Sequence, residues 1–224
     1  MNIRLGIYEI FSRIVPGGVY ITAIVQLLNV LGLLTIDWQA LNDLSLIAST
    51  GLAVVAYIVG GALNPYSFIW LQLFGLKGVS HETLAAFKAR HRDHWDIDIH
   101  DKDWPVLLAF LRTKDLEVSG DIERQNAISI MLRNVSLGLG LMAVNFVIAF
   151  VRYPLEGLAQ ANIIAAAVTL FVSVLIARES TKFRRWFYDN VFETTLAYRL
   201  DLERMIKPKY GGSIKPKREE NQEE

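Results

Sequence analysis

The 224-residue sequence contains no cysteine, which excludes structural disulfides and thiolate metal sites and is typical of a chain whose polar parts lie in a reducing cytosol. It also lacks net charge: 23 lysines and arginines balance 23 aspartates and glutamates, so no overall field attracts nucleic acid. Four stretches contain no charged residue at all: 14–36, 44–76, 134–151 and 157–177. Each is long enough for a helix to cross about 30 Å of hydrocarbon. The sequence therefore predicts an integral membrane protein.

The motifs that most often accompany catalysis are missing as well. The sequence has neither a Gly-rich phosphate loop nor a G-x-S-x-G nucleophile elbow. The four charge-free stretches also lack histidine, so they contain none of the ionisable side chains that proton-coupled transporters and pumps use. We therefore expect a protein that is not an enzyme and needs no cofactor. The missing intramembrane charge disfavours a small-solute transporter, which remains an alternative.

The basic residues predict the orientation of the chain in the membrane. Two lie before residue 14, none in the loop 37–43, nine in 77–133, one in 152–156 and eleven after residue 177. Four spans therefore put 22 of the 23 cationic residues on one side of the membrane. By the positive-inside rule, that side is the cytosol. The predicted fold class is an all-α polytopic protein of the cytoplasmic (inner) membrane, with four transmembrane helices, a small helical cytoplasmic region and both termini in the cytosol.

Helix breakers and composition divide the chain into five segments. The predicted segments are 1–76, an N-terminal interfacial helix and the first transmembrane hairpin; 77–133, a cytoplasmic helical segment; 134–177, the second transmembrane hairpin; 178–206, a cytoplasmic C-terminal helix; and 207–224, a disordered tail.

The positions of the prolines, and the stretches without helix-breaking residues, predict where the helices in these segments begin and end. Pro16 is expected in the first turn of span one, where its missing N–H has no helical partner. Asn64-Pro65 is expected to end span two, because 33 charge-free residues in one helix would be longer than a bilayer is thick. No breaker separates Ser119 from span three, so this helix is expected to run unbroken from the cytosol into the bilayer. The helix of span four is likewise expected to continue past Arg178 to about Met205.

Each predicted span carries polar or small side chains at helical spacing. The polar members of these stripes are Gln26, Asn29, Asn134, Asn145, Asn162 and Thr169. Close helix packing is one explanation, since side-chain amides form hydrogen bonds across membrane helices. The other is a polar path in a homo-oligomer, for which Gln26, Asn29 and Asn145 are the strongest candidates.

A loop rich in histidine and aspartate offers a candidate metal site. The side chains of His91, His94, Asp96, Asp98 and His100 could form a nitrogen and oxygen shell for Zn²⁺ or Mn²⁺. The alternative is a solvated acidic loop, followed by Asp103 as the N-cap of the next helix.

Two features follow span four. Four cations and a tryptophan lie just after the span, and their side chains could bind lipid headgroups or a partner. They are Arg178, Lys182, Arg184, Arg185 and Trp186. Their position beside a span favours lipid, and no direct binding of nucleic acid is expected. Further along, Tyr188, Phe192, Leu196 and Leu200 form one apolar stripe, which must be buried. The predicted 80–94 helix, a neighbouring subunit and a second protein are its possible partners.

The segments Tyr8–Gly18 and Ile130–Ser136 resemble parts of small uncharacterised bacterial four-span inner-membrane proteins, some of which are encoded beside antiphage defence genes. This resemblance implies a membrane effector or a membrane anchor of such a system. The leading hypothesis is a non-enzymatic, homo-oligomeric membrane protein that couples a cytoplasmic signal or protein partner to the bilayer, either as an anchor or by forming a pore. The alternatives are a membrane-bound metal-dependent enzyme that uses the loop 91–103 and a small-solute transporter.

Overall fold

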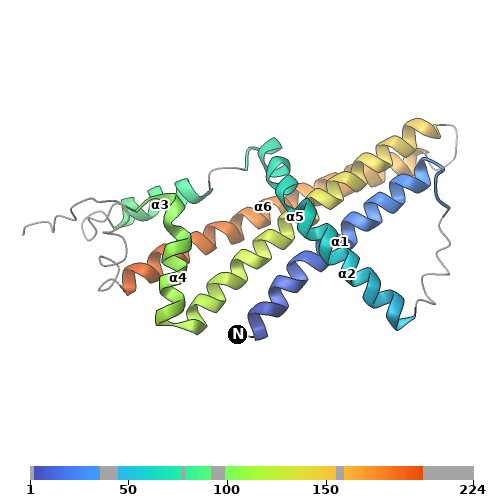
Figure 1. Ribbon diagram of the computed structural model, residues 1–224. Helices are drawn as coiled ribbons and strands as arrows, with labels where there is room; N and C mark the ends of the chain where they lie inside the picture. The colour runs from blue at the N-terminus through green and yellow to red at the C-terminus, as the bar shows by residue number, and fades with distance from the viewer. Residues whose placement is uncertain (1–2, 36–44, 77–78, 92–98, 155–158, 199–224) are drawn as a thin grey trace, which may run out of the picture. The chain divides into compact units, whose positions relative to one another are not determined.

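The computed structural model describes residues 3–35, 45–76, 79–91, 99–154 and 159–198 (Figure 1). Within these ranges the chain forms six α-helices and one short 3₁₀ helix, and no strand. Four of the helices are long and apolar enough to cross a membrane: α1 (Ile3–Val30), α2 (Leu46–Leu73), α5 (Leu116–Arg152) and α6 (Ala159–Ala197). The predicted fold class, all-α with four helices able to span a membrane, is confirmed.

The chain forms two compact units. Unit 1 comprises Met1–Lys77 and Arg124–Phe183, and unit 2 comprises Gly78–Glu123 and Arg184–Glu224. Unit 1 contains α1, α2 and the greater part of α5 and α6. Unit 2 contains α3 (Val79–Arg90), the 3₁₀ helix η1 (Asp101–Asp103) and α4 (Trp104–Lys114), with the remaining parts of α5 and α6. Of the predicted cytoplasmic segments 77–133 and 178–206, residues 124–133 and 178–183 therefore belong to unit 1.

Helix α1 is a single element that includes the predicted interfacial helix and span one. The expectation that Pro16 lies in a first turn is wrong, because the helix begins at Ile3 and Pro16 lies inside it. A proline within a membrane helix removes one hydrogen bond, and packing against neighbouring helices compensates for this loss. Here the packing is close: a methyl group on Gly17 would overlap the backbone carbonyl of Ala56 in α2. Likewise, a methyl group on Gly60 would overlap the carbonyl of Arg13.

Helix α2 corrects a second expectation. It continues from Leu46 to Leu73 through Pro65, so Asn64-Pro65 does not end the span. Its 28 residues extend about 42 Å, which exceeds the roughly 30 Å of bilayer hydrocarbon. A helix of excess length fits a bilayer by tilting or kinking rather than by ending. In Figure 1, α2 crosses α1 rather than running alongside it.

Helices α5 and α6 bear out the expectation of unbroken helices. Helix α5 follows Asp115, whose carboxylate accepts hydrogen bonds from the backbone N–H groups of Glu117 and Val118 at 2.9 and 3.0 Å. It then runs for 37 residues to Arg152, where Tyr153 and Pro154 end it. Helix α6 runs for 39 residues to Ala197, and its expected end near residue 205 lies outside the described residues.

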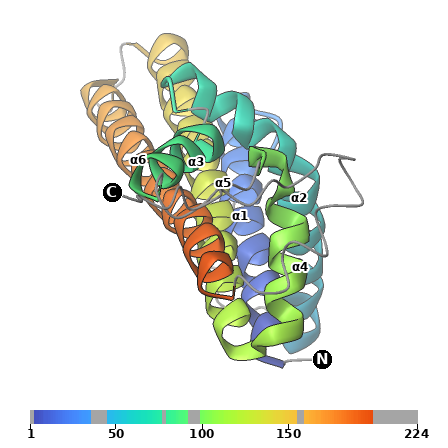
Figure 2. The ribbon, with the colours of Figure 1, turned by 90° about the vertical axis from the view of Figure 1, so that its left-hand side faces the viewer.

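Unit 2 has an aromatic core of its own, in which α3, α4 and α6 meet. The ring of Phe87 from α3 lies 5.6 Å from that of Phe192 from α6. The indole of Trp104, at the start of α4, meets the ring of Phe187 edge-on at 5.3 Å. Such pairs contribute about 0.5–1.5 kcal/mol each beyond the burial of their area. Figure 2 shows unit 2 from another side, with α3 beside α6.

Candidate functional site

A buried polar cluster lies in unit 1 where α2 meets α5. Helix α2 contributes Asn64, Ser67 and Phe68, whose spacing of three and four residues puts them on one helical face. Helix α5 contributes Arg133 and Asn134, at the start of its charge-free stretch 134–151. Pro65 therefore lies within the helical turn that faces the arginine.

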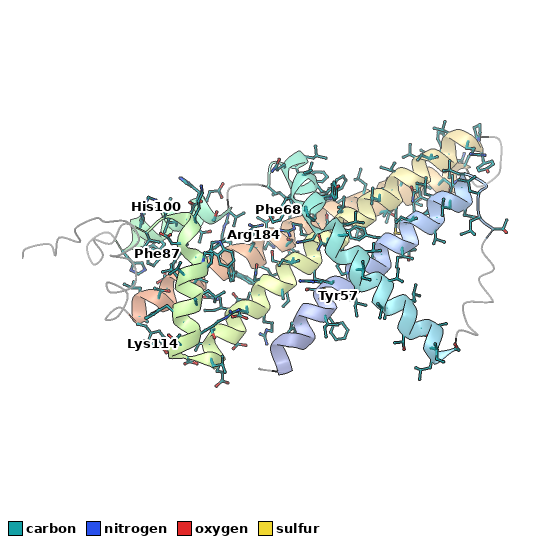
Figure 3. The ribbon with its side chains drawn as sticks, in the orientation of Figure 1. Tyr57, Phe68, Phe87, His100, Lys114 and Arg184 are labelled. Atoms are coloured by element: carbon teal, nitrogen blue, oxygen red, sulfur yellow. The ribbon has the colours of Figure 1, made fainter. Side chains whose placement is uncertain are left out.

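Arg133 binds this turn of α2 through three contacts. Its Nε donates to the hydroxyl of Ser67 at 2.7 Å, and its Nη2 donates to the side-chain carbonyl of Asn64 at 2.8 Å. The centre of its guanidinium lies 3.5 Å from the centroid of the Phe68 ring. Figure 3 labels Phe68 on α2. The side-chain amide of Asn134 donates to the same Asn64 oxygen at 3.1 Å, so this one acceptor serves two donors.

Arginine is suited to this place because its guanidinium is planar, weakly hydrated and permanently charged. Arg133 is only 2% exposed, so its hydrogen bonds form away from water. In such surroundings a bond to a charged group is stronger than on a surface, and a donor that loses its partner costs more. The cluster therefore ties α2 to α5 and fixes the position of the turn around Pro65.

Further polar contacts continue along α5 towards α6. The indole N–H of Trp70 in α2 donates to the hydroxyl of Ser136 at 3.0 Å. The hydroxyls of Ser136 and Ser173 each donate to the other residue's backbone carbonyl, at 2.9 and 2.7 Å. Ser129 and Ser180 exchange the same reciprocal bonds, both at 2.9 Å. These small side chains allow the backbones of α5 and α6 to approach closely.

Two buried polar atoms next to this cluster have no hydrogen-bond partner in the described part of the chain. They are the hydroxyl of Tyr20 in α1 and the side-chain oxygen of Asn134 in α5. Both side chains are fully buried. Tyr20 packs against Gly138, one helical turn beyond Asn134, where an added methyl group would lie 3.3 Å from the tyrosine ring. Unpaired buried polar atoms are rare in folded proteins and each calls for an explanation.

The predicted polar stripes lie in several environments. Asn134 belongs to the cluster, and Asn145 is buried and donates from its amide to the carbonyl of Ala23 in α1 at 2.6 Å. Gln26 is partly buried and its side-chain oxygen has no partner among the described residues, whereas Asn29 is exposed in the last turn of α1. On α6, Asn162 and Thr169 are partly buried; the intervening Ala166 is buried. Helix packing accounts for Asn134 and Asn145, and the polar path stays a prediction.

Only two of the five candidate metal ligands are in the described ranges. Nε2 of His91 lies 3.0 Å from a carboxylate oxygen of Glu193 on α6. His100 precedes η1, and its backbone N–H donates to the carboxylate of Asp103 at 3.0 Å. His94, Asp96 and Asp98 lie outside the described residues. Within the described ranges, no three histidine, aspartate or glutamate side chains are grouped as a metal site requires.

The acidic-loop alternative predicts Asp103 as the N-cap of the following helix. Asp103 does directly precede α4, but its side chain makes no cap bond to that helix and instead accepts the bond from His100.

The cations after span four have partners within the chain. Lys182 pairs with Glu179 at 2.5 Å, Arg185 with Glu82 at 3.3 Å, and Arg184 donates to the hydroxyl of Tyr188 at 3.2 Å. Arg178 is exposed, and Trp186 is 51% exposed. Part of their charge is therefore balanced within the chain, and binding of lipid headgroups stays a prediction.

The apolar stripe on α6 is buried within its own unit. Tyr188 and Phe192 belong to the core of unit 2, and Leu196 packs against it. Of the three partners considered for this stripe, the chain's own α3 helix is the one found, together with α4. Leu200 lies outside the described residues.

Sequence reasoning missed the role of Arg133 and of its partners on α2. It assigned Arg133 to a cytoplasmic segment and Asn64-Pro65 to a helix end. One pattern could have revealed the cluster: Asn64, Ser67 and Phe68 share a helical face if the helix continues through the proline. A buried arginine then becomes the natural partner for two polar groups in an otherwise apolar span.

No protein family, curated protein or solved structure shows detectable similarity to this chain.

Proposed function

We propose that this chain is a non-enzymatic protein of the cytoplasmic membrane that couples a signal or partner received by unit 2 to the bilayer. In this proposal the four long helices span the membrane, both termini and unit 2 lie in the cytosol, and the spans either anchor a complex or open a leak. The distribution of basic residues supports the orientation, because 21 of the 22 lysines and arginines other than the buried Arg133 lie on the proposed cytosolic side.

The continuity of α5 and α6 is the observation that carries the proposal. Residues Leu116–Glu123 of α5 belong to unit 2, and the same helix continues to Arg152 in unit 1. Helix α6 begins in unit 1 at Ala159 and ends in unit 2. Neither helix is interrupted, so a shift or rotation of its cytosolic end acts on the span of the same helix.

The contacts within unit 2 support its proposed role of passing the effect of a bound partner to α5 and α6. Its core is held by aromatic packing, and ion pairs connect α3 to α6: Arg90 to Asp189 at 2.7 Å and Arg185 to Glu82 at 3.3 Å. Arg112 donates a hydrogen bond to Glu123, which raises the pKa of the guanidinium and links α4 to the start of α5. A partner that changes the packing of α3 or α4 would therefore act on both long helices.

The surroundings and assembly of the protein follow from the same proposal. Arg178, Lys182, Arg184 and Arg185 would lie beside anionic headgroups, where a cation contributes about 1 kcal/mol. Association into a homo-oligomer would provide the polar path that a leak needs. The resemblance to inner-membrane proteins encoded beside antiphage defence genes favours a role as membrane effector or anchor in such a system.

Membrane potential in intact cells tests the leak directly. If the protein opens a leak, cells expressing it depolarise and release a small dye when the system is activated, here by phage infection. Asn145→Leu, which removes the bond to Ala23, should change the rate of depolarisation, whereas Val147→Leu, an exposed position on the same helix, should not. An unchanged potential under infection would exclude the leak and leave the anchor, which co-purification of a partner through unit 2 would then test.

A further inference from the structure

We propose that Arg133 is a two-position latch that controls whether the second half of α2 is held against α5. In the first position, which the structure shows, the guanidinium binds Asn64 and Ser67. In the second, it binds the two unpaired buried oxygens, the Tyr20 hydroxyl and the Asn134 side-chain carbonyl. The latch deepens the proposed function, on which its physiological consequence rests, by naming the switching element within the spans.

Helix α2 changes its packing partner in the turn that ends at Pro65. Ahead of this turn, Ala56 and Gly60 pack against the backbone of α1. From Asn64 onwards, side chains of α2 bond to α5: Asn64 and Ser67 accept from Arg133, and Trp70 donates to Ser136. A helix is most easily bent at an internal proline, because the backbone bond that would resist bending is missing there. The second half of α2 can therefore move separately from the first, and contacts with α5 hold it in place.

The second position already has its acceptors. The side chains of Arg133 and Asn134 both bind the same oxygen of Asn64, so the unpaired oxygen of Asn134 is near the guanidinium. The ring of Tyr20 packs against Gly138, one helical turn beyond Asn134 on the same helix. A guanidinium has five N–H donors, and a buried acceptor without a donor is unfavourable. Moving the guanidinium gives these oxygens a partner and releases Asn64 and Ser67 on α2.

The two positions leave different groups unsatisfied, which is the condition for a switch. In the first, the unpaired atoms belong to α1 and α5; in the second, the bonds across to α2 are lost. Each position pairs the guanidinium with two oxygens and leaves the other two without it, so the number of these hydrogen bonds does not by itself favour either position. A small displacement of α5 can then shift their populations, because packed interfaces change between discrete arrangements rather than deforming continuously.

Pulsed electron–electron distance measurements in lipid nanodiscs test the latch. The cysteine-free chain allows two spin labels to be placed without background, at the exposed positions Leu73 on α2 and Val144 on α5. The wild type should give one dominant distance. Asn64→Ala removes one acceptor of the first position. The population ratio of the second distance to the first should therefore rise about tenfold, equivalent to about 1.4 kcal/mol. Ser67→Ala tests the same position if Asn64→Ala does not insert.

Tyr20→Phe distinguishes a switch from simple loosening. In the Asn64→Ala background, removing the tyrosine hydroxyl should suppress the second distance, because that hydroxyl is part of the second position. In an Arg133→Gln background, Tyr20→Phe should have no further effect. Thr22→Ala is the matched control, because it removes an exposed hydroxyl from the same helix as Tyr20, one that donates to the carbonyl of Gly18.

Two results would overturn the latch. One is a distance distribution in both Asn64→Ala and Ser67→Ala that matches the wild type. The other is a second distance that persists in the Tyr20→Phe combination. The measurement needs no trigger or partner, so a negative result alongside an infection-dependent leak would remove the latch and leave the proposed function. The reverse outcome would leave the latch and remove the leak.

Discussion

Two substitutions in the buried cluster should differ in how much they lower the free energy of unfolding. Asn64→Leu should destabilise the protein more than Arg133→Met, although the arginine is the charged member. The reason is the number of groups that each change leaves without a partner. The side-chain oxygen of Asn64 accepts from both Arg133 and Asn134, so its loss removes one acceptor from a charged donor and from an amide donor.

The magnitudes follow from counting these groups. A buried donor that loses its acceptor costs about 1–3 kcal/mol, so with two such donors Asn64→Leu should cost about 2–6 kcal/mol. After Arg133→Met, the Asn64 oxygen still accepts from Asn134, and the Ser67 hydroxyl still donates to the Asn64 backbone carbonyl at 2.6 Å. The lost stacking on Phe68 and the lost hydrogen bonds are also offset by removal of a buried charge. We expect a cost of about 0–2 kcal/mol for Arg133→Met.

Equilibrium unfolding in mixed micelles, titrated with a denaturing detergent, measures both costs. The double variant should cost clearly less than the sum of the single variants, because without the arginine its unpaired donor no longer exists. Thr50→Ala, at an exposed hydroxyl of α2, should leave the midpoint unchanged. Equal costs for Arg133→Met and Asn64→Leu, or costs that add in the double variant, would contradict this prediction.

Three further predictions concern helix packing. A Ser136→Cys and Ser173→Cys pair should form a disulfide on mild oxidation, since the two hydroxyl oxygens are 3.2 Å apart; mass spectrometry detects the bond, and the mismatched Ser136→Cys and Ser180→Cys pair should form none. Gly60→Leu should separate α1 from α2 and lower the unfolding midpoint in detergent, while Gly51→Leu, which has open space around it, should not. Phe192→Ala should cost about 3–5 kcal/mol and make unit 2 sensitive to protease, whereas Trp186→Ala at an exposed position should leave the cleavage rate unchanged.

The spans could be predicted because they depend on the distribution of charge along the chain. Helices α5 and α6 were expected to be continuous because no proline or glycine pair interrupts them, and they are. The prolines were harder to interpret. Pro16 and Pro65 both lie inside helices, because close contacts with neighbouring helices stabilise the interrupted turns, and those contacts join residues far apart in the sequence.

The place of Arg133 could not be predicted for the same reason, because its partners lie far away in the sequence. The sequence around Arg133 predicts the same helix whether the side chain faces water or Asn64. The path of α2 decides which of the two it faces. The apolar stripe on α6 was easier, because Tyr188 and Phe192 had to be buried somewhere, but the sequence left three possible partners. The choice of α3 and α4 depends on how the elements of unit 2 fold together.

Labelling of single cysteines from outside the cell tests the central claim most directly, namely that α5 and α6 carry a cytosolic unit into the membrane. Ser45→Cys and Pro154→Cys should react in intact cells with a membrane-impermeant maleimide. Leu116→Cys and Ala197→Cys, at exposed positions in the parts of α5 and α6 that belong to unit 2, should react only after the membrane is permeabilised. Reaction of Leu116→Cys or Ala197→Cys in intact cells would contradict the account, because unit 2 would then lie on the opposite side of the membrane.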